Sequence, residues 1–468
     1  MSDAKQLVTQ LFKISNINVP ANRMLLFNQF LQDEQNQAII DQIIQNQNQL
    51  MAKWQTEERI AEILEQPIRI ANATVGKPYE AKLDFGKFGW QDIISYQLEG
   101  LEPIGLKYDE NTGLITGVPT QSGDILLIFK FKIKDQPEEA PANEKQITLI
   151  INPDPKSLWK ILESDKNDPH WKEDNVTVFA PLGDRHILVS SKRGRSHANI
   201  GSFREDDFAF QDLANGWSLV VVADGAGSAK LSRKGSALAC ATVVNYFQED
   251  SAAESMREFD ELVQQHAGKT GEDTQKKLNR LVYNNLGKAA FQAHKQLEVF
   301  ATAEGVTLKD LSSTLIFSLF KKYDTGYALL SFGVGDCPIA VLNKDISEVN
   351  LMNWIDVGEF GGGTRFITMP EIFQSEKFAT RFGFKLLEDF SYLIMMSDGI
   401  YDPKFVVEAN LPNITKWQEF LADLNGQNED GTKVELSTEN KDIEAQFSKW
   451  MDFWSPGNHD DRTLAIVF

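Results

Sequence analysis

Three short apolar stretches in the second half of the chain run into an aspartate. Residues 219–223 lead directly to Asp224, residues 392–396 lead through a serine to Asp398, and residues 328–332 lead through Gly-Val-Gly to Asp336. Apolar runs of this length predict buried strands. Because a strand holds the backbone at its end in place, we expect these carboxylates to point into one shared cleft.

Two further acidic groups accompany these strands. The run Glu205-Asp206-Asp207 comes before the first strand, and Asp460-Asp461 comes just before the last apolar stretch, residues 464–468. Mg²⁺ and Mn²⁺ prefer oxygen ligands and need only a few carboxylates plus waters. A single Asp-Gly pair is an ordinary turn, but its repetition at strand ends predicts a site for divalent cations.

Composition limits the class of protein. A chain of 468 residues with 42% hydrophobic residues predicts about two or three folded domains. The net charge of −20 argues against a nucleic-acid partner, because phosphate backbones would be repelled. The two cysteines form no disulfide framework, and the chain has neither a secretory leader nor an apolar run of the ~18 residues that span a bilayer. We therefore expect a soluble, cytoplasmic protein with no membrane partner.

Other catalytic classes are excluded by their missing motifs. A cysteine-dependent phosphatase needs Cys and Arg in the spacing C-x₅-R, but Tyr246 and Asn343 stand at the sixth position after the two cysteines. The chain also contains neither a GxxxxGK[ST] loop nor an HExxH motif.

Sequence character changes twice along the chain. Residues 1–66 are rich in Gln and Asn with apolar residues at helical spacing, which predicts a helical segment of two or three helices. Residues 67–153 alternate between apolar and polar residues and are interrupted by turn residues, which predicts an all-β module. Residues 156–468 mix strands with long helical patterns at 232–248 and 275–303, and with charged stretches near 249–275 and 424–445. The chain is thus predicted to be an α+β protein of three domains.

One apolar stripe in the helical segment admits two interpretations. It comprises Ile39, Ile40, Ile43, Ile44, Leu50, Met51 and Trp54. Such stripes usually pack internally, and we favour that interpretation. A docking helix for a protein partner is the alternative.

Residues 105–123 of the β module, GLKYDENTGLITGVPTQSG, resemble the tGxIxGxPtxxG signature of immunoglobulin-like modules found in many bacterial proteins. Glycines in this pattern fit tight turns between strands. The resemblance implies a spacer or protein-binding unit, so residues 1–153 are expected to bind a protein partner.

The acidic motifs of residues 175–468, in combination and order, strongly resemble the metal-dependent protein serine/threonine phosphatases (PPM family, protein phosphatase 2C type). Four pieces carry the resemblance: HANIGSFREDDF from His197, VADGAGSAKLSRKGSA from Val222, SSTLI from Ser312 with GVGDC from Gly333, and SDGI from Ser397 with HDDRTL from His459. Two of its stretches, GRSH and DGAGSA, resemble a bacterial subgroup. An α-β-β-α sandwich of two antiparallel sheets with helices outside is the implied fold.

The resemblance also implies a site with two Mg²⁺ or Mn²⁺ ions and room for a third. Asp224 would bridge the two ions, Asp398 and Asp460 would complete the shell of one, and Glu205 with the Gly225 carbonyl would serve the other. Asp206 would act behind them or through a water, and Asp336 would bind a weaker third ion. Asp207 could replace Asp206, and Asp461 could replace Asp460, although the DDxT pattern favours the first aspartate.

Phosphate capture is where the sequence departs from the family. Many members carry an Arg a few residues before the acidic pair, whereas this chain has Gly201-Ser-Phe there. Arg195 is then the first candidate for the phosphate contact and Arg204 the second, with a solvated surface role open for both. Residues 358–365, which include three consecutive glycines and Arg365, correspond to a variable flap beside the cleft of the family; an ordinary surface loop is the alternative.

The proton donor is also open. Some relatives carry His after the Asp-Gly pair, where this chain has Ala226. A water, His197 or His459 could serve instead, while a structural hydrogen-bonding role is favoured for both histidines.

The sequence therefore predicts hydrolysis of phosphoserine or phosphothreonine in a phosphoprotein by a metal-activated water. The rival interpretation is a pseudo-phosphatase that uses the same fold as a binding or scaffolding module in a signalling complex. The missing Arg supports the rival. Retention of Asp224, Asp398 and Asp460 opposes it, because clustered carboxylates repel one another and are costly to desolvate.

Overall fold

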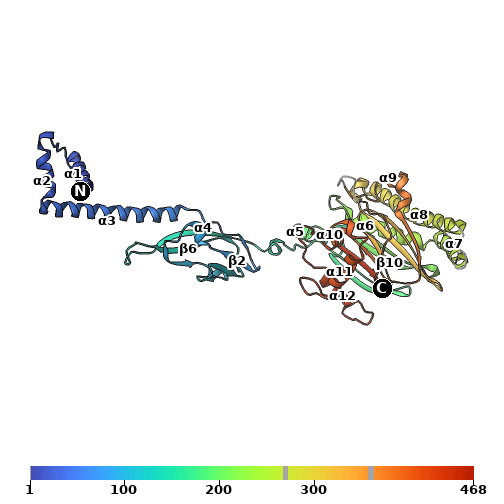
Figure 1. Ribbon diagram of the computed structural model, residues 1–468. Coiled ribbons are helices and arrows are strands. Elements are labelled where there is room, and N and C mark those ends of the chain that lie inside the picture. The colour runs from blue at the N-terminus through green and yellow to red at the C-terminus, as the bar shows by residue number, and fades with distance from the viewer. Residues whose placement is uncertain (1, 267–271, 357–362) are drawn as a thin grey trace. The chain divides into compact units, whose positions relative to one another are not determined.

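The computed structural model describes residues 2–266, 272–356 and 363–468. It divides into two compact units, residues 1–158 and residues 159–468 (Figure 1). Each unit is described by itself below.

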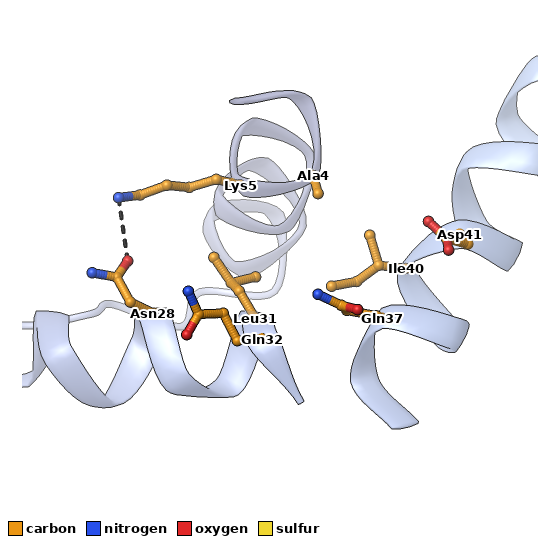
Figure 2. A pocket seen from close by; sticks show the side chains of 8 residues that line it. All are labelled: Ala4, Lys5, Asn28, Leu31, Gln32, Gln37, Ile40 and Asp41. Atoms are coloured by element: carbon orange, nitrogen blue, oxygen red, sulfur yellow. Dashed lines mark hydrogen bonds between the residues drawn. The ribbon is translucent and has the colours of Figure 1, made fainter. Parts of the chain in front are cut away.

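Three helices open the first unit: α1 (Ser2–Ile14), α2 (Met24–Gln32) and α3 (Glu34–Glu65). Asp33 caps α3, since its carboxylate accepts hydrogen bonds from the backbone N–H groups of Gln35 and Asn36. Val8, Phe27 and Ile40 form a small core between the helices. A pocket of ≈ 660 Å³ lies beside this core, where Lys5 donates a hydrogen bond to Asn28 (Figure 2).

Only part of the apolar stripe of α3 packs internally, as the sequence interpretation favoured for the whole stripe. Ile40 is buried, but Leu50 and Trp54 are each 62% exposed and Met51 is 48% exposed. The reason is that α1 and α2 are too short to cover a helix of 32 residues.

Two sheets follow in the first unit. The first has the strand order β1 (Ala73–Thr74), β7 (Asn143–Asn152), β6 (Gly123–Ile133), β3 (Ile93–Glu99), and the second has the order β2 (Tyr79–Lys82), β5 (Leu114–Gly117), β4 (Leu106–Asp109). β1 pairs with β7 in parallel, and the other pairs are antiparallel. The short helix α4 (Phe85–Phe88) lies between β2 and β3 in the sequence. Ile60 and Ile63 near the end of α3 join the core of these sheets, so the helix and the β part share one core.

The second unit contains two antiparallel sheets. The five-stranded sheet has the order β10 (Asp207–Asp212), β11 (Ser218–Ala223), β12 (Leu315–Tyr323), β13 (Gly326–Val334), β16 (Phe382–Leu387). The six-stranded sheet has the order β15 (Val349–Leu351), β14 (Ile339–Asn343), β17 (Phe390–Met396), β18 (Arg462–Val467), β9 (Arg185–Lys192), β8 (Asn175–Leu182). Val220 and Ile316 of the first sheet share a buried core with Val189 and Leu393 of the second, so the sheets pack face to face.

Helices cover the outer face of each sheet (Figure 1). α6 (Ser232–Gln248), α7 (Asp250–His266) and α8 (Glu272–Glu304) share a core with the five-stranded sheet. α10 (Asp398–Phe405), α11 (Ile414–Leu424) and α12 (Ile443–Trp450) share a core with the six-stranded sheet. Two short helices, α5 (Arg195–Ile200) and α9 (Glu371–Gln374), complete the unit. Within the described residues, no helix combines the length and apolar character needed to cross a bilayer.

The charged stretch near residues 249–275 contains a helix that the sequence interpretation did not predict. Ala252, Met256, Phe259 and Val263 of α7 are all buried. Their spacing of three or four residues places them on one helical face. The many acidic residues between them hid this pattern.

Candidate metal centre

Asp224 and Asp398 come directly from strand ends of different sheets. Asp224 follows β11, and its backbone is held by Thr314, whose hydroxyl oxygen accepts from the Asp224 N–H at 2.8 Å while the Thr314 N–H donates to the Asp224 carbonyl at 2.7 Å. Asp398 is the first residue of α10, and only Ser397 separates it from the end of β17. Because the two sheets pack face to face, these strand ends meet.

The pKa values of Asp224 and Asp398 indicate that several carboxylates lie close together in one cluster. Burial raises the pKa of Asp224 well above its usual value, and the negative charges of Asp398, Asp206, Asp460 and Asp336 raise it further. For Asp398, burial and the same neighbouring charges of Asp460, Asp336 and Asp206 also raise the pKa. Such an arrangement is unfavourable unless cations or protons neutralise it.

Asp398 also has a side-chain oxygen without a partner. Its Oδ1 is buried and, within the described residues, makes no hydrogen bond. Buried polar atoms are normally hydrogen-bonded, so an orphaned carboxylate oxygen requires a physical reason. A donor set made of carboxylates fits Mg²⁺ or Mn²⁺, which supplies that reason.

Glu205 and Asp206 approach the cluster from the loop before β10. Glu205 accepts a hydrogen bond from the Ser232 hydroxyl at 2.6 Å, and burial raises its pKa to about 7. Asp206 accepts from the Thr463 hydroxyl at 2.8 Å, and burial together with the charge of Asp461 raises its pKa to about 7. Gly225 packs against the backbone of Glu205, so this loop lies close to the end of β11.

The side chain of Asp207 binds a lysine instead of joining these two residues. Its carboxylate accepts a hydrogen bond from Lys172 Nζ at 3.1 Å. The same lysine donates to the Asp206 carbonyl at 2.7 Å and thereby holds the loop. Asp207 is therefore paired with a lysine, and it is Asp206 that repels Asp224.

Asp460 and Asp461 have different surroundings. The Asp461 side chain is 2% exposed, and its oxygens accept from the backbone N–H groups of Gly194, Glu205 and Asp206 and from the His197 ring. Although burial alone would raise the pKa of Asp461, these hydrogen bonds and the His197 charge lower it overall. The Asp460 side chain is 47% exposed and contributes to the repulsion at Asp224 and Asp398. Asp460 thus faces the carboxylate cluster, whereas Asp461 binds the backbone near residue 194 and at residues 205–206.

His197 lies on α5 between these groups. Its Nδ1 is 2.9 Å from Asp461 Oδ1, and its Nε2 is 3.8 Å from Asp460 Oδ1. Burial lowers the pKa of His197, but the hydrogen bond to Asp461 and the charges of Asp461, Glu205 and Asp460 outweigh burial and raise the pKa to about 9.

The two arginines named from the sequence are engaged with the protein itself. Arg204 is 3% exposed and donates to the Glu173 carbonyl, the Ser191 hydroxyl and the Asp206 carbonyl. Arg195 donates to the carbonyl oxygens of Asp452 and Phe453. Burial and these bonds argue against Arg204 as a phosphate contact, and the bonds of Arg195 leave it with few free donors.

A second acidic group surrounds Asp336. The Thr364 hydroxyl donates to Asp336 at 2.6 Å, and burial raises the pKa of the Asp336 carboxyl. Burial and the charge of Asp336 also raise the pKa values of Asp402 and Glu408. Sequence reasoning missed both residues. Asp402 lies four residues after Asp398 on α10, and this helical spacing was the available signal.

The predicted flap, residues 358–365, lies largely outside the described residues. Of its two ends, the structure describes residues 363–365. Arg365 is exposed and directly follows Thr364, the residue bonded to Asp336.

Solved structures similar to this chain include three bacterial phosphatases. The serine/threonine phosphatase Stp1 from Staphylococcus aureus is 15% identical, with 63% of this chain and 98% of that chain covered and a TM-score of 0.36. PstP/Ppp from Mycobacterium tuberculosis is 14% identical (61% and 98% covered, TM-score 0.36), as is the S. agalactiae serine/threonine phosphatase (61% and 99% covered, TM-score 0.35). These TM-scores are too low to support an argument, and no curated protein matches the chain.

The family assignment depends on the sequence match instead. Residues 193–440, more than half of the chain, match the family described as protein phosphatase 2C, whose members are metal-dependent phosphatases. The matched region contains Glu205, Asp224, Asp336 and Asp398, and Asp460 follows it. The chain belongs to the protein phosphatase 2C family.

Proposed function

We propose that this chain hydrolyses phosphoserine and phosphothreonine in protein substrates at a site that binds two Mg²⁺ or Mn²⁺ ions. The observation that carries the proposal is the buried pair Asp224 and Asp398: the charge of Asp398 raises the pKa of Asp224, and Asp398 Oδ1 is a buried oxygen without a hydrogen-bond partner within the described residues. A scaffold gains nothing from such a pair, whereas a metal site needs it.

Each acidic residue has a proposed position in this site. Asp224 would lie between the two ions, Asp398 and Asp460 would hold one of them, and Glu205 with the Gly225 carbonyl would hold the other. Asp206 would act behind these ligands or through a water, and its negative charge raises the pKa of both Asp224 and Asp398. Asp336, now joined by Asp402 and Glu408, would hold a third ion more weakly.

Bound divalent cations would supply neutralisation of phosphoryl charge and acidification of water. The chain's own residues position the site and contact the substrate. Asp461 fixes the Glu205 loop and His197 relative to the last strand through its four hydrogen bonds. Arg365 is exposed and follows Thr364, which binds Asp336, so we propose it as the contact for the substrate phosphate.

A cavity offers room for the protein substrate. Its volume is ≈ 480 Å³, and its lining includes Ser228, Ala229 and Lys309. Ser228 and Ala229 belong to the loop that begins at Asp224, and Phe366 and Thr368 of the lining follow Arg365. We therefore assign this cavity to the residues that flank the phosphorylated side chain.

The first unit has a proposed role in binding a partner. We propose a helical segment (1–66) and an immunoglobulin-like module (67–153) ahead of the phosphatase domain (156–468). Two sheets with the first and last strands paired in parallel support the module. The exposed side chains of Leu50, Met51 and Trp54 support a protein partner for residues 1–153. A bacterial-type protein acting in the cytoplasm fits the two buried free cysteines.

Phosphate release tests the proposal. Wild-type protein should release phosphate from p-nitrophenyl phosphate and from a phosphothreonine peptide with Mn²⁺, and EDTA should abolish release. Asp224→Asn should lower kcat/KM by at least about 1,000-fold, because several kcal/mol of charge stabilisation depend on the bound cations. The exposed Asp324, mutated to Asn, is the matched control and should retain wild-type activity. Turnover that persists in EDTA would exclude the metal-dependent mechanism.

A pseudo-phosphatase remains the second candidate. It is favoured by one observation, the engagement of Arg195 and Arg204 with the protein itself. In that case Mn²⁺ would bind without measurable phosphate release. Loss of activity in Arg365→Ala, with Mn²⁺ binding unchanged, would instead identify the phosphate contact and favour the enzyme.

A further inference from the structure

The imidazole of His197 is held in one orientation by Asp461. His197 lies on α5, and Asp461 precedes β18. The remaining donors to Asp461 are three backbone N–H groups, those of Gly194, Glu205 and Asp206. The His197 side chain is only 12% exposed, so packing also restricts the ring.

This hydrogen bond decides which ring nitrogen carries a proton. Each carboxylate oxygen of Asp461 accepts at least one hydrogen bond from a backbone N–H, which is the arrangement of an ionised carboxylate. An ionised carboxylate only accepts, so Nδ1 of His197 is the donor. In the neutral ring, Nε2 then presents its lone pair on the opposite side.

Nε2 faces the candidate metal ligands. It lies 3.8 Å from Asp460 Oδ1, and a Cβ placed on Gly227 would lie 3.6 Å from Nε2 and 4.0 Å from Glu205 Oε2. A separation of 3.8 Å is too long for a hydrogen bond. Two atoms that each lie about 2.0–2.2 Å from one ion are at most about 4.4 Å apart, so a separation of 3.8 Å is within reach of a shared ion. His197, Asp460 and Asp461 each offer one ligand atom, and these atoms all lie within 4.8 Å of one another.

We propose that His197 Nε2 is a ligand of the cation that Asp460 binds, with Asp461 as the carboxylate that orients the imidazole. The inference rests on the proposed metal-dependent function. Histidines that bind metals usually donate their other ring N–H to a carboxylate, which fixes the ring and makes the free nitrogen a better donor. Asp461 itself is already engaged by four donors, so it orients His197 rather than binding the ion.

One chemical consequence is metal preference. A nitrogen ligand in a site otherwise made of carboxylates strengthens binding of Mn²⁺ and later transition metals relative to Mg²⁺. The chain is therefore expected to prefer Mn²⁺ over Mg²⁺ by at least about tenfold in dissociation constant, a ratio that depends on His197.

The test is electron spin-echo spectroscopy of Mn²⁺ bound to the full chain. Imidazole nitrogen bound directly to Mn²⁺ should give a ¹⁴N modulation in wild-type protein. His197→Asn should abolish the modulation, because the Asn amide can still donate to Asp461 in place of Nδ1 but has no atom at the Nε2 position. Calorimetric titration should show at least about tenfold weaker Mn²⁺ binding in this variant, and Mg²⁺ binding should change less.

His459 provides the matched control. It precedes Asp460, and its ring packs between Trp159 and Trp454 at centroid distances of 4.3 and 5.0 Å. His459→Gln should keep the ¹⁴N modulation. If the modulation vanished there and persisted in His197→Asn, the assignment to His197 would be wrong.

Two results separate failure of this inference from failure of the proposed function. Bound Mn²⁺ without ¹⁴N modulation in wild-type protein would overturn the His197 assignment and leave the carboxylate site intact. No bound Mn²⁺ in wild-type protein would overturn both. If His197→Asn retained wild-type Mn²⁺ affinity while the KM for the phosphopeptide rose, His197 would be a phosphate contact, and the ligand assignment would again fail.

Discussion

The backbone of Glu205 lies so close to Gly225 that no side chain fits at position 225. A Cβ on Gly225 would lie 2.5 Å from the Glu205 carbonyl oxygen and 2.9 Å from its carbonyl carbon. Both contacts are with backbone, so relief would require the loop before β10 to move. The position of Glu205 relative to Asp224 therefore depends on the absence of a side chain at residue 225.

We predict that Gly225→Ala weakens Mn²⁺ binding by at least about tenfold, because a displaced Glu205 carboxylate no longer converges on Asp224. Calorimetric titration measures the change. Gly287→Ala is the control: this glycine lies within α8, and an added Cβ would meet Phe382 at an ordinary 3.5 Å. That variant should bind Mn²⁺ normally and gain about 0.5–1 kcal/mol of stability. Equal affinities in both variants would contradict the role of the Gly225 contact.

Among the helices and strands, the C-terminal end of α3 packs against the sheets of the first unit. Ile60 and Ile63 are buried in the shared core. Arg59 forms two hydrogen bonds with Asp92, at 2.7 and 2.9 Å, and donates another to the Gly89 carbonyl. The Trp90 indole N–H donates to the Gln66 side chain at 2.7 Å. These contacts hold the C-terminal turns of α3 in a fixed position on the sheets.

We predict that Asp92→Asn lowers the free energy of opening of the α3 end by about 1 kcal/mol at pH 6, a modest value because both side chains are about a third exposed. The hydrogen bond from Arg59 lowers the pKa of Asp92. The contribution is therefore complete above the unfolded pKa of about 3.9 and is lost as pH falls through the lower folded pKa. Hydrogen exchange of peptides covering residues 55–66 measures it. The difference between wild type and variant should shrink as pH falls below about 3.9, and a difference that stayed constant there would contradict the assignment.

For the whole molecule, the division into two units separates the candidate ligands from the N-terminal region. Asp224, Asp398, Asp460, Glu205 and His197 all lie within residues 159–468. A ligand that binds only the folded state stabilises the unit that holds it. Cation binding should therefore act on one unit alone.

We predict two calorimetric unfolding transitions for the full chain, of which Mn²⁺ raises only one. At a free concentration of about 100 times its dissociation constant, the ion adds about 2.7 kcal/mol to the stability of residues 159–468, which raises the melting temperature of that unit by several degrees. EDTA should reverse the shift. An equal shift of both transitions would indicate cation binding in the first unit or strong coupling between units.

The sequence by itself determined most of the elements and predicted which aspartates lie at the ends of the buried strands. Apolar runs at residues 219–223 and 392–396 became β11 and β17, and the patterns at 232–248 and 275–303 became α6 and α8. Local signals sufficed there, because a buried strand and its following turn are encoded by neighbouring residues. The family resemblance, carried by short motifs in a fixed order, is confirmed by the match over residues 193–440.

Only the tertiary structure decided what each charged side chain faces. Asp460 and Asp461 are neighbours in one motif, yet the first faces the carboxylate cluster and the second accepts hydrogen bonds from backbone more than 250 residues away in the chain. Arg204 was a candidate for the substrate contact and is buried against carbonyl groups. The α3 stripe was expected to pack internally, but its C-terminal part, Leu50, Met51 and Trp54, is exposed. The ends of β11 and β17 look like separate turns in the sequence, and they converge because the two sheets pack face to face. That packing depends on contacts between distant segments, which no local pattern encodes.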